Sequence, residues 1–501
     1  MFYPDIKEFK NLSKKYNIIP VYKEILADCE TPVSAYSKLA LNKEYSYLLE
    51  SVEGSERWGR YSFLSWAPKL IFKSKGKTFT ITKNSKTQHG TADNPLNELK
   101  KIMSVYKPVH IKGLPRFWGG AVGYIGYEMI HNFEEIPPIA GKTSDQDDAA
   151  LLLTDTIVIF DHFTHKTKIV ACADMSLGKQ NIEKHYKDAC KKINSIIEEL
   201  RQKKNLEISN FLDLNKPKAG FSGMKSNLTK HQYMDSVCKA KEYIKAGDII
   251  QTVLSQRFEK KMKAHPFSIY RVLRTLNPSP YMLYLNFNDF QLVGSSPEIL
   301  VRKEENRAIL RPIAGTKPRG KTSEEDIKNE KELISSDKER AEHIMLVDLG
   351  RNDIGRVCEY NSVKIPELMV MEKYSHVIHL VSSVTGTLKK GKDAFDLFAA
   401  CFPAGTVSGA PKIRAMEIIA ELEKLPRGSY AGAVGYFSYS GNMDMAITIR
   451  TILFKNHTAY VQAGAGIVAD SDPEQEYIET TNKAGALFNA IALAENIENN
   501  R

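Results

Sequence analysis

The sequence lacks the segments that membrane-spanning and secreted proteins need. None of its apolar runs approaches the roughly 20 residues required to cross a bilayer, and the opening stretch, MFYPDIKEFKNLSKKYN, has no apolar signal-peptide core. The six cysteines stand far apart without CxxC spacing, which argues against a zinc site or a disulfide framework. These absences predict a cytoplasmic protein without a membrane partner.

Basic-aromatic stripes and known nucleic-acid-binding modules are also missing, although the net charge is +10. The lysines and arginines are spread along the chain in runs no longer than KK or KKGK. We therefore predict no nucleic-acid partner and interpret the charge as solvated surface that attracts anionic ligands. With 42% hydrophobic and 26% charged residues, the composition is that of a globular protein.

Two regions of different character divide the chain near residue 215. The first, 1–215, alternates short strands with turns and contains a charged helical segment at 178–204. Residues 215–229 are rich in proline, glycine and serine, as linkers are. The second region, 216–501, opens with a helix that Thr229 can cap and Gly247 can end. Most motif-like stretches lie there, so we expect the chemistry there.

Two similar octapeptides occur far apart, GAVGYIGY at 120–127 and GAVGYFSY at 432–439. Both are typical of strands whose glycines let another backbone or a ligand approach closely. They suggest two sheets with similar edges, or chance.

Two segments with helical periodicity each carry a Glu-x-x-Glu pair, Glu339 with Glu342 and Glu476 with Glu479, and Asp472 can cap the second helix. A spacing of three puts both carboxylates of a pair on one helix face. Mg²⁺ suits such a site because it takes one or two carboxylates and keeps several waters. A solvated helix face explains either pair alone, but two helices with apolar backs and matching pairs favour a metal.

Three glycine-rich stretches accompany these helices: RPIAGTKPRG (311–320), FPAGTVSGAPKIRAMEIIAELE (402–423) and QAGAGIVADSDPE (462–474). None has the GxxxxGK[ST] order of a phosphate loop. In the second stretch Ser408 is predicted to cap a helix whose free N–H groups favour an anion. Turn chemistry explains each stretch alone; together with the carboxylates they predict a pocket for a small anion. In the first stretch Arg311, Lys317 and Arg319 are predicted to be flanking surface or hinge.

Arg450 and His379 both fall in strand-like patterns. A buried arginine must be paired, and the planar fork of Arg450 suits a carboxylate of the protein or of a ligand. His379, by contrast, is typical of a satisfied core histidine.

Taken together, these stretches resemble the chorismate-utilising enzyme family, most of all its anthranilate synthase component I (large-subunit) members. The resemblance spans essentially the whole chain and rests on ten motifs that follow the family's order: LLES, GSSPEIL, RPIAGT, EHIMLVDLGRND, HLVSSVTG, FPAGTVSGAPK, GAVGYF, TIRT, QAGAGIVADSDPE and ETTNKA. It implies an α+β fold in which two large antiparallel β-sheets pack as a sandwich with flanking helices. It also assigns the first region an effector pocket and the second the binding of chorismate.

The resemblance implies roles for the site residues. Glu298 would be the general acid that protonates the departing C4 hydroxyl of chorismate, and His379 would assist the later loss of pyruvate, with Thr316 also among the catalytic residues. Mg²⁺, bound to the ring carboxylate, would be held by four glutamates: Glu342 and Glu479, with Glu339 and Glu476 close by. The substrate would be bound by Gly315, Thr316, Tyr430, Arg450, Ala465, Gly466 and Lys483. Arg450 and Tyr430 would grip the enolpyruvyl carboxylate, and Lys483 would neutralise the carboxylate cluster.

Two positions indicate the branch of the family. Relatives that add water place a lysine base where this chain has Gln251, and aminodeoxychorismate synthases typically place a nucleophilic lysine where it has Ala314. The resemblance therefore implies that ammonia adds directly to chorismate and that anthranilate forms. Component I of aminodeoxychorismate synthase stays an alternative, because some members lack that lysine. A non-catalytic, anion-binding relative is a third hypothesis, although it predicts the loss of carboxylates that are all present.

The family resemblance extends to regulation and to a partner. LLES and NPSPYM resemble the tryptophan feedback pocket, which would be formed by Glu50, Ser51, Pro280, Tyr281 and Met282; plain packing between domains is the alternative. No cysteine lies in the Gly-x-Cys-x-Gly elbow of a glutamine amidotransferase. The chain would then need a separate glutaminase subunit (component II) or free ammonia.

Overall fold

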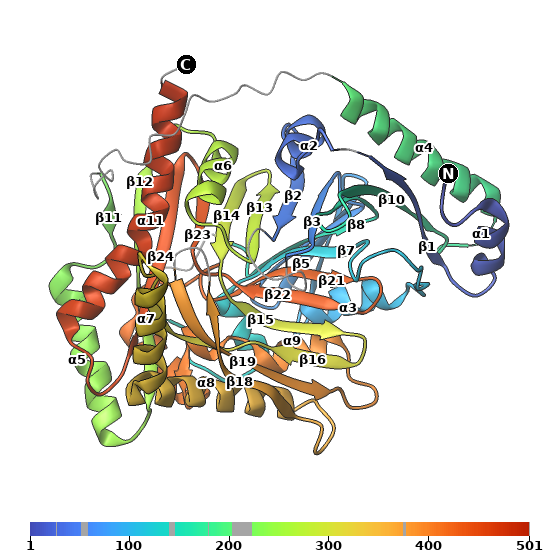
Figure 1. The fold of residues 1–501 in the computed structure, drawn as a ribbon. Helices are drawn as coiled ribbons and strands as arrows, with labels where there is room; N and C mark the ends of the chain where they lie inside the picture. The colour runs from blue at the N-terminus through green and yellow to red at the C-terminus, as the bar shows by residue number, and fades with distance from the viewer. Residues whose placement is uncertain are drawn as a thin grey trace.

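Among the described residues, two antiparallel β-sheets of twelve strands each form the centre of the molecule (Figure 1). The computed structural model describes residues 1–26, 28–51, 59–139, 146–178, 180–202, 223–373 and 377–499. The first sheet consists, in spatial order, of β1 (Ile18–Ile25), β10 (Lys166–Asp174), β9 (Thr156–Asp161), β3 (Tyr61–Trp66), β2 (Tyr45–Glu50), β13 (Tyr281–Phe287), β14 (Phe290–Ser296), β23 (Thr451–Lys455), β24 (Thr458–Ile467), β12 (Gln251–Lys261) and β11 (Lys225–Ser226), with β20 (Gly409–Ala410) paired to β12.

The second sheet is built in the same way from both ends of the chain. Its order is β17 (Ile313–Pro318), β19 (Val377–Thr387), β16 (Arg307–Leu310), β15 (Ile299–Glu304), β22 (Met443–Ile447), β21 (Ala433–Ser438), β7 (Gly120–Ile125), β8 (Ala149–Thr154), β4 (Leu70–Lys75), β5 (Thr78–Lys83) and β6 (Lys86–Thr91), with β18 (Lys364–Lys373) paired to β19. The predicted α+β fold with two large antiparallel sheets is confirmed. Each sheet takes strands from both predicted regions, and the predicted linker lies partly outside the described residues, which omit 203–222.

Helices cover the outer faces of both sheets (Figure 1). They are α1 (Ile6–Ser13), α2 (Pro32–Leu39), α3 (Leu96–Ser104), α4 (Ile182–Arg201), α5 (Lys230–Ala246), α6 (Pro266–Leu276), α7 (Ser323–Ser335), α8 (Asp337–Gly355), α9 (Ala394–Cys401), α10 (Lys412–Leu422) and α11 (Pro473–Asn499), with short 3₁₀ turns η1 (Tyr127–Asn132) and η2 (Gly405–Val407). The red helix α11 runs beside β24 and contacts α5 and α6, while α8 lies across β17 and β19. No described helix is long and apolar enough to span a bilayer.

The two largest apolar cores among the described residues hold these layers together. The inner core fills the space between the sheets, where Leu283 and Leu285 of the first sheet pack in one cluster with Tyr124 and Leu151 of the second. The outer core lies between the first sheet and the helices α1, α2, α4, α6 and α11. Alternation along the strands explains both cores, because successive side chains point to opposite faces of a sheet.

Helix ends follow the predicted capping residues at three of four positions. The N–H of Gln232 donates to Thr229 Oγ1 (3.2 Å), and Gly247 ends α5 with a φ of +83°. The N–H of Gln475 donates to Asp472 Oδ1 (2.9 Å) at the start of α11. The prediction that Ser408 caps a helix is wrong. Residues Gly409–Ala410 pair with β12 instead, and α10 begins only at Lys412.

The two glycine-rich octapeptides form neighbouring strands in the middle of the second sheet. β7 and β21 pair antiparallel with Gly123 opposite Gly435, so the expectation of two separate sheet edges is wrong. A Cβ on Gly123 would lie 1.9 Å from the carbonyl oxygen of Ala150, and one on Gly435 would lie 2.0 Å from that of Asp444. These glycines therefore permit close backbone approach, as their sequence pattern predicts.

Candidate active site

Two crossings between the sheets bring together the backbone segments that carry Glu298 and Arg450. Glu298 lies between β14 of the first sheet and β15 of the second, and Arg450 lies between β22 of the second sheet and β23 of the first. The N–H of Ile447 donates to the carbonyl oxygen of Glu298 (3.0 Å), and the N–H of Ser295 donates to that of Arg450 (3.0 Å). Arg450 is not inside a strand, as its pattern had suggested; it sits in a left-handed bend with a φ of +51°.

The guanidinium of Arg450 makes no hydrogen bond or ion pair with any described residue. Burial lowers its pKa. The nearby Tyr430 and Glu479 raise that pKa in part, and the positive charge of Arg450 in turn lowers the pKa of His379. Because this half-buried guanidinium has no partner among the described residues, its donors can bind an anionic ligand. No protein carboxylate pairs with Arg450 among the described residues, so a ligand carboxylate stays the prediction for its partner.

Tyr430 stands beside the strand β24, which carries glycines on the same face. A Cβ on Gly464 would lie 2.6 Å from Tyr430 Oη, and a Cβ on Gly466 would lie 3.0 Å from Gln251 Nε2. Burial raises the pKa of Tyr430 to about 12, so its phenol keeps the proton and can donate it in a hydrogen bond. Gln251 is buried, and its Oε1 has no hydrogen-bond partner among the described residues.

Ala465 differs from its two glycine neighbours. Its side chain is fully buried on the other face of β24, in a cluster with Leu254 and Ile419. A contact from Ala465 to a substrate would therefore have to come from its backbone.

Glu298 is half-buried, and this burial raises its pKa to about 8. The Thr406 hydroxyl opposes this shift in part. Both residues line a cavity of about 40 Å³, together with Arg311 and Asp353. At neutral pH the carboxyl group is thus largely protonated, which is the state that a general acid requires.

The RPIAGT stretch forms β17 and contacts the first carboxylate helix. Gly315 has a φ of +66°, and a Cβ there would lie 2.9 Å from Glu339 Oε2. His379 Nδ1 donates to the carbonyl oxygen of Gly315 (3.1 Å), and burial lowers the pKa of this histidine. Its Nδ1 is therefore protonated and its ring neutral. Thr316 lies opposite His379 in the strand pairing, but its side chain falls outside the described part.

The three basic residues of this stretch differ from one another. Lys317 pairs with Glu332 (3.2 Å) and Arg319 with Asp326 (2.6 Å) near the surface, as predicted. The side chain of Arg311 is only 11% exposed and forms an ion pair with Glu372, so its prediction as flanking surface is wrong. Arg311 lines both the small cavity at Glu298 and a larger one described below.

The two carboxylate helices, α8 and α11, bring their charges together. The pKa of Glu342 is raised by burial and then by Glu339, with a further contribution from Glu479. The pKa of Glu476 is raised by burial and by Glu479. Lys483 Nζ lies 2.5 Å from Glu479 Oε1 and 3.0 Å from the carbonyl oxygen of Gly464. A cationic group thus already contacts this cluster.

The carboxylates do not form a closed metal cage. Within the described ranges, no three His, Cys, Asp or Glu side chains are arranged to hold an ion by themselves. Mg²⁺ needs only one or two carboxylates when waters and a ligand complete its shell. The repelling pair Glu342 and Glu479 fits such an open site, in which a bound anion supplies the remaining oxygens.

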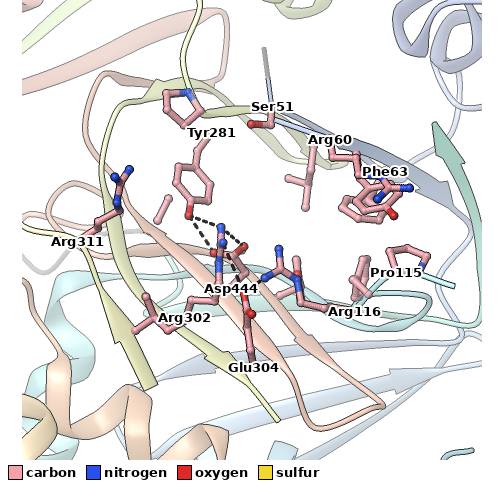
Figure 2. Close-up of a pocket in the computed structure, with 18 of the residues that line it drawn as sticks. Ser51, Arg60, Phe63, Pro115, Arg116, Tyr281, Arg302, Glu304, Arg311 and Asp444 are labelled. Carbon is pink, nitrogen blue, oxygen red and sulfur yellow. Dashed lines mark hydrogen bonds and ion pairs between the residues drawn. The ribbon is translucent and has the colours of Figure 1, made fainter. Parts of the chain in front are cut away.

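A second cavity, of about 1050 Å³, lies between the sheets and away from these carboxylates (Figure 2). Ser51, Tyr281, Arg302 and Asp444 face it, and Arg311 lies on the side opposite Arg60. Its lining also includes the other predicted effector residues, namely Glu50, Pro280 and Met282. All five predicted effector residues, which lie at the end of β2 and the start of β13 or directly beside them, thus line one cavity.

The walls of this cavity carry polar groups that a ligand can use. Tyr281 Oη donates to Asp444 Oδ1 (3.0 Å) and accepts from Arg302 Nη2 (3.1 Å). Glu50, whose side chain is 1% exposed, accepts hydrogen bonds from Tyr270 and from Arg274 Nε (3.1 Å) through one oxygen. Its other oxygen has no partner among the described residues. A buried acceptor of this kind suits a donor such as an ammonium group.

Sequence reasoning missed a buried polar group beneath the site, formed by Glu128, Glu423 and Arg427. Arg427 is fully buried, and its guanidinium lies 5.7 Å from the centre of the Tyr430 ring. The stretch EKLPRG looks like an exposed turn, and only the apolar residues on both sides hint at burial.

The chain is similar in sequence to a known protein family and to proteins of established name. A family model described as chorismate binding enzyme matches residues 47–489. The chain is 49% identical over 493 residues to anthranilate synthase component 1 of Aquifex aeolicus, covering 98% of each chain, and 47% identical over 499 residues to that of Acetivibrio thermocellus, covering 99% of this chain and 100% of the relative.

Solved structures agree with this comparison. The crystal structure of anthranilate synthase component I from Streptococcus pneumoniae has 38% sequence identity and a TM-score of 0.74, covering 92% of this chain and 98% of that chain. The menaquinone-specific isochorismate synthase of Escherichia coli, at 17% identity and a TM-score of 0.69 over 97% of this chain and 99% of that chain, shares the fold.

Proposed function

The chain belongs to the family of chorismate-binding enzymes, and from this membership we propose that it is component I of an anthranilate synthase. It would convert chorismate and ammonia to anthranilate, pyruvate and water, a lyase reaction in tryptophan biosynthesis. The observation that carries the proposal is the guanidinium of Arg450, which has no partner among the described residues and lies near Tyr430 and Glu479. That arrangement suits a substrate with two carboxylates.

The substrate would be oriented by its two carboxylates. Arg450 and the Tyr430 hydroxyl would bind the enolpyruvyl carboxylate, since one is a cation and the other a protonated phenol. Glu342 and Glu479, with Glu339 and Glu476 nearby, would hold Mg²⁺ at the ring carboxylate. The ion would supply charge neutralisation and polarisation at that carboxylate. Lys483 already neutralises part of this cluster.

The first chemical step needs an acid and a nucleophile. Protonated Glu298 would give its proton to the C4 hydroxyl, which leaves as water while ammonia bonds to C2. The resulting ammonium group would lose one proton, which restores the proton count of the enzyme. Gln251 cannot act as a base for water, and Ala314 offers no nucleophile, which favours ammonia as the attacking group.

The second step removes pyruvate and makes the ring aromatic. The C2–H proton is lost, the bond between the ring and the enolpyruvyl oxygen breaks, and the enolpyruvyl group takes up a proton as pyruvate leaves. His379 is neutral, with its proton fixed on Nδ1 by the carbonyl oxygen of Gly315, so its Nε2 is the atom able to accept a proton. We assign His379 to this step.

Ammonia would come from glutamine through a separate amidotransferase subunit, because none of the six cysteines has the sequence context of a glutaminase nucleophile. The purified chain alone should therefore use ammonium salts but not glutamine.

A single incubation tests the proposed function. The purified chain is mixed with chorismate, Mg²⁺ and an ammonium salt, and the products are identified by mass and fluorescence. Anthranilate and pyruvate in equal amounts are expected. Aminodeoxychorismate without pyruvate would assign the chain to the aminodeoxychorismate synthases instead, and no product would support a non-catalytic relative.

We further propose that the large cavity is an inhibitory tryptophan site. Ser51 and Tyr281 face it, and the unpartnered oxygen of Glu50 is available to an amino group (Figure 2). Of the described residues around it, Arg60, Arg116 and Arg302 can balance the carboxylate of an amino acid.

Replacing Ser51 with phenylalanine tests this site. The larger side chain would occupy part of the cavity, and we expect the tryptophan concentration for half inhibition to rise by about tenfold or more, or about 1.4 kcal/mol of binding. Turnover without tryptophan should stay near that of the wild type, because Glu298 and Arg450 are not among the described residues that line this cavity. Ser335→Phe, at an exposed position on α7, is the matched control. Unchanged inhibition in Ser51→Phe would locate the effector elsewhere.

A further inference from the structure

A buried ion pair lies directly beneath the proposed substrate site. Glu423 follows the end of α10, and Arg427 comes four residues later; their side chains are 6% and 0% exposed. Arg427 Nε donates to Glu423 Oε2 (2.9 Å), and Nη2 donates to Oε1 (2.6 Å). This two-pronged geometry fixes the plane of the guanidinium.

The remaining hydrogen bonds of Arg427 reach two walls of the site. Nη1 donates to the carbonyl oxygen of Val407 (2.7 Å). The preceding residue, Thr406, lines the small cavity together with Glu298. Nη2 donates to the carbonyl oxygen of Val253 (2.7 Å). Val253 lies two residues after Gln251 and pairs with Gly466.

The faces of the guanidinium contact two aromatic rings. Its central carbon lies 4.7 Å from the centre of the Tyr127 ring and 5.7 Å from that of Tyr430. Arg427 thus contacts a residue that we assign to carboxylate binding, and its positive charge opposes the burial-driven rise in the pKa of Tyr430.

Both ends of the ion pair are themselves anchored. The N–H and the hydroxyl of Ser255 each donate to Glu423 Oε1 (2.8 Å). The carboxylate of Glu128, in η1 of the first region, accepts from the N–H groups of Arg427 (2.7 Å) and Gly428 (2.9 Å). The arginine therefore has one position, set from β12, η1 and α10 together.

We propose that Arg427 is a positioning residue, which sets the spacing between three parts of the chorismate site: the Gln251–Val253 strand, the Thr406–Val407 turn and the Tyr430 ring. The proposal rests on the proposed function for the identity of the ligand. A buried ion pair contributes little to stability in general because desolvation of both charges opposes it. The contacts of Arg427 go instead to neighbours of the residues that touch the substrate.

Arg427→Lys is the most informative variant, because it keeps the positive charge and removes the planar guanidinium with its paired donors. Lysine has three donors on one atom and cannot make the four directed bonds of this arginine. One wall should then shift relative to the others. Misplacement on the scale of 1 Å in a binding site costs up to about 100-fold in activity.

The experiment measures chorismate binding by isothermal titration with Mg²⁺ and without ammonia, so that no turnover is needed. We expect Arg427→Lys to bind chorismate at least about tenfold more weakly, with an unchanged stoichiometry of one per chain. A purely structural role would lower the stoichiometry, through loss of folded protein, and leave the dissociation constant of the remaining sites unchanged. That second pattern would overturn the proposal.

Two further variants and a control complete the test. In Arg427→Ala, millimolar guanidinium should restore part of the affinity by entering the vacated space; failure of rescue in a variant that stays folded counts against the proposal. Glu423→Gln should weaken binding in the same direction. Arg414→Lys, in a surface ion pair with Asp248 (2.7 Å), should bind as the wild type does.

These outcomes are separable from those of the proposed function. A wild-type chain that binds chorismate but forms no anthranilate would contradict the function, while the ratio of dissociation constants would still decide the role of Arg427. A wild-type chain that binds no chorismate would overturn both.

Discussion

Glu298→Gln is expected to lose about 10³-fold in kcat, because a positioned general acid contributes about 10²–10⁴-fold and glutamine has no proton to give. The amide has nearly the same shape, so chorismate binding should change little and KM should stay close to the wild-type value. Initial rates of anthranilate formation, followed by fluorescence with saturating ammonium, measure both quantities. Glu305→Gln, an exposed residue of the next hairpin, is the matched control.

The pH dependence of the wild type provides a second measurement on the same group. The pKa of Glu298 is raised to about 8, so the acid is protonated below that pH and ionised above it. The rate of the acid-dependent step should therefore be flat on the acidic side and fall as pH rises through about 8. A pH profile of kcat that falls instead as pH decreases would contradict the assignment.

The Glu298→Gln substitution, which lowers activity, should raise the stability of the fold. The folded pKa of Glu298 lies above its unfolded value, so its contribution to stability is fully present below about pH 4.5 and is lost as pH rises through about 8. Glutamine cannot ionise, so the substitution removes this loss of stability at high pH. Glu298→Gln should therefore unfold at a higher temperature than the wild type at pH 8, which separates a chemical defect from misfolding.

Local sequence patterns predicted the features that depend on neighbours in the chain. Thr229 and Asp472 cap helices because their side chains reach N–H groups three residues ahead, and the Glu-x-x-Glu spacing puts both carboxylates on one face. The glycines of GAVGY permit close approach because a Cβ has no room. The sheet pairing of β7 with β21 was not predictable in this way, because it joins segments some three hundred residues apart.

The site itself depends on contacts that no local pattern contains. Ser408 looks like a cap, yet Gly409–Ala410 pair with β12, and this long-range pairing moves the helix start to Lys412. Glu423 and Arg427 have the spacing of an ordinary surface pair, and only the packing of β12, η1 and Tyr430 around them reveals a buried one. The family motifs predict the residues and their order along the chain, whereas the pairing of the segments that carry Glu298 and Arg450 comes from the crossings between the sheets.

The second large effect on turnover is expected from substitutions of the carboxylates on α8 and α11. Glu342→Ala and Glu479→Ala are each expected to reduce Mg²⁺-dependent turnover to below about 1% of the wild type, since loss of even a residue that supports a metal ligand costs about 10–100-fold. Mn²⁺ binding, followed by electron paramagnetic resonance with chorismate present, should weaken in parallel and does not depend on turnover. Glu474→Ala, on an exposed position of α11 paired with Lys230, is the control. Full activity in either variant would contradict the metal assignment.

Glu342→Ala should also stabilise the metal-free protein, which would argue for a binding role of this carboxylate rather than a structural one. The pKa of Glu342 is raised by burial and by the charges of Glu339 and Glu479, so ionised Glu342 is disfavoured in the folded state near neutral pH. Alanine removes this repulsion, and Glu342→Ala without Mg²⁺ should unfold at a higher temperature than the wild type. A group whose removal stabilises the fold but abolishes turnover is maintained for its ligand. Lys483 Nζ lies 2.5 Å from Glu479 Oε1 and neutralises this carboxylate. When chorismate adds its own carboxylate to the cluster, the total negative charge rises, and Mg²⁺ would then stabilise the cluster most.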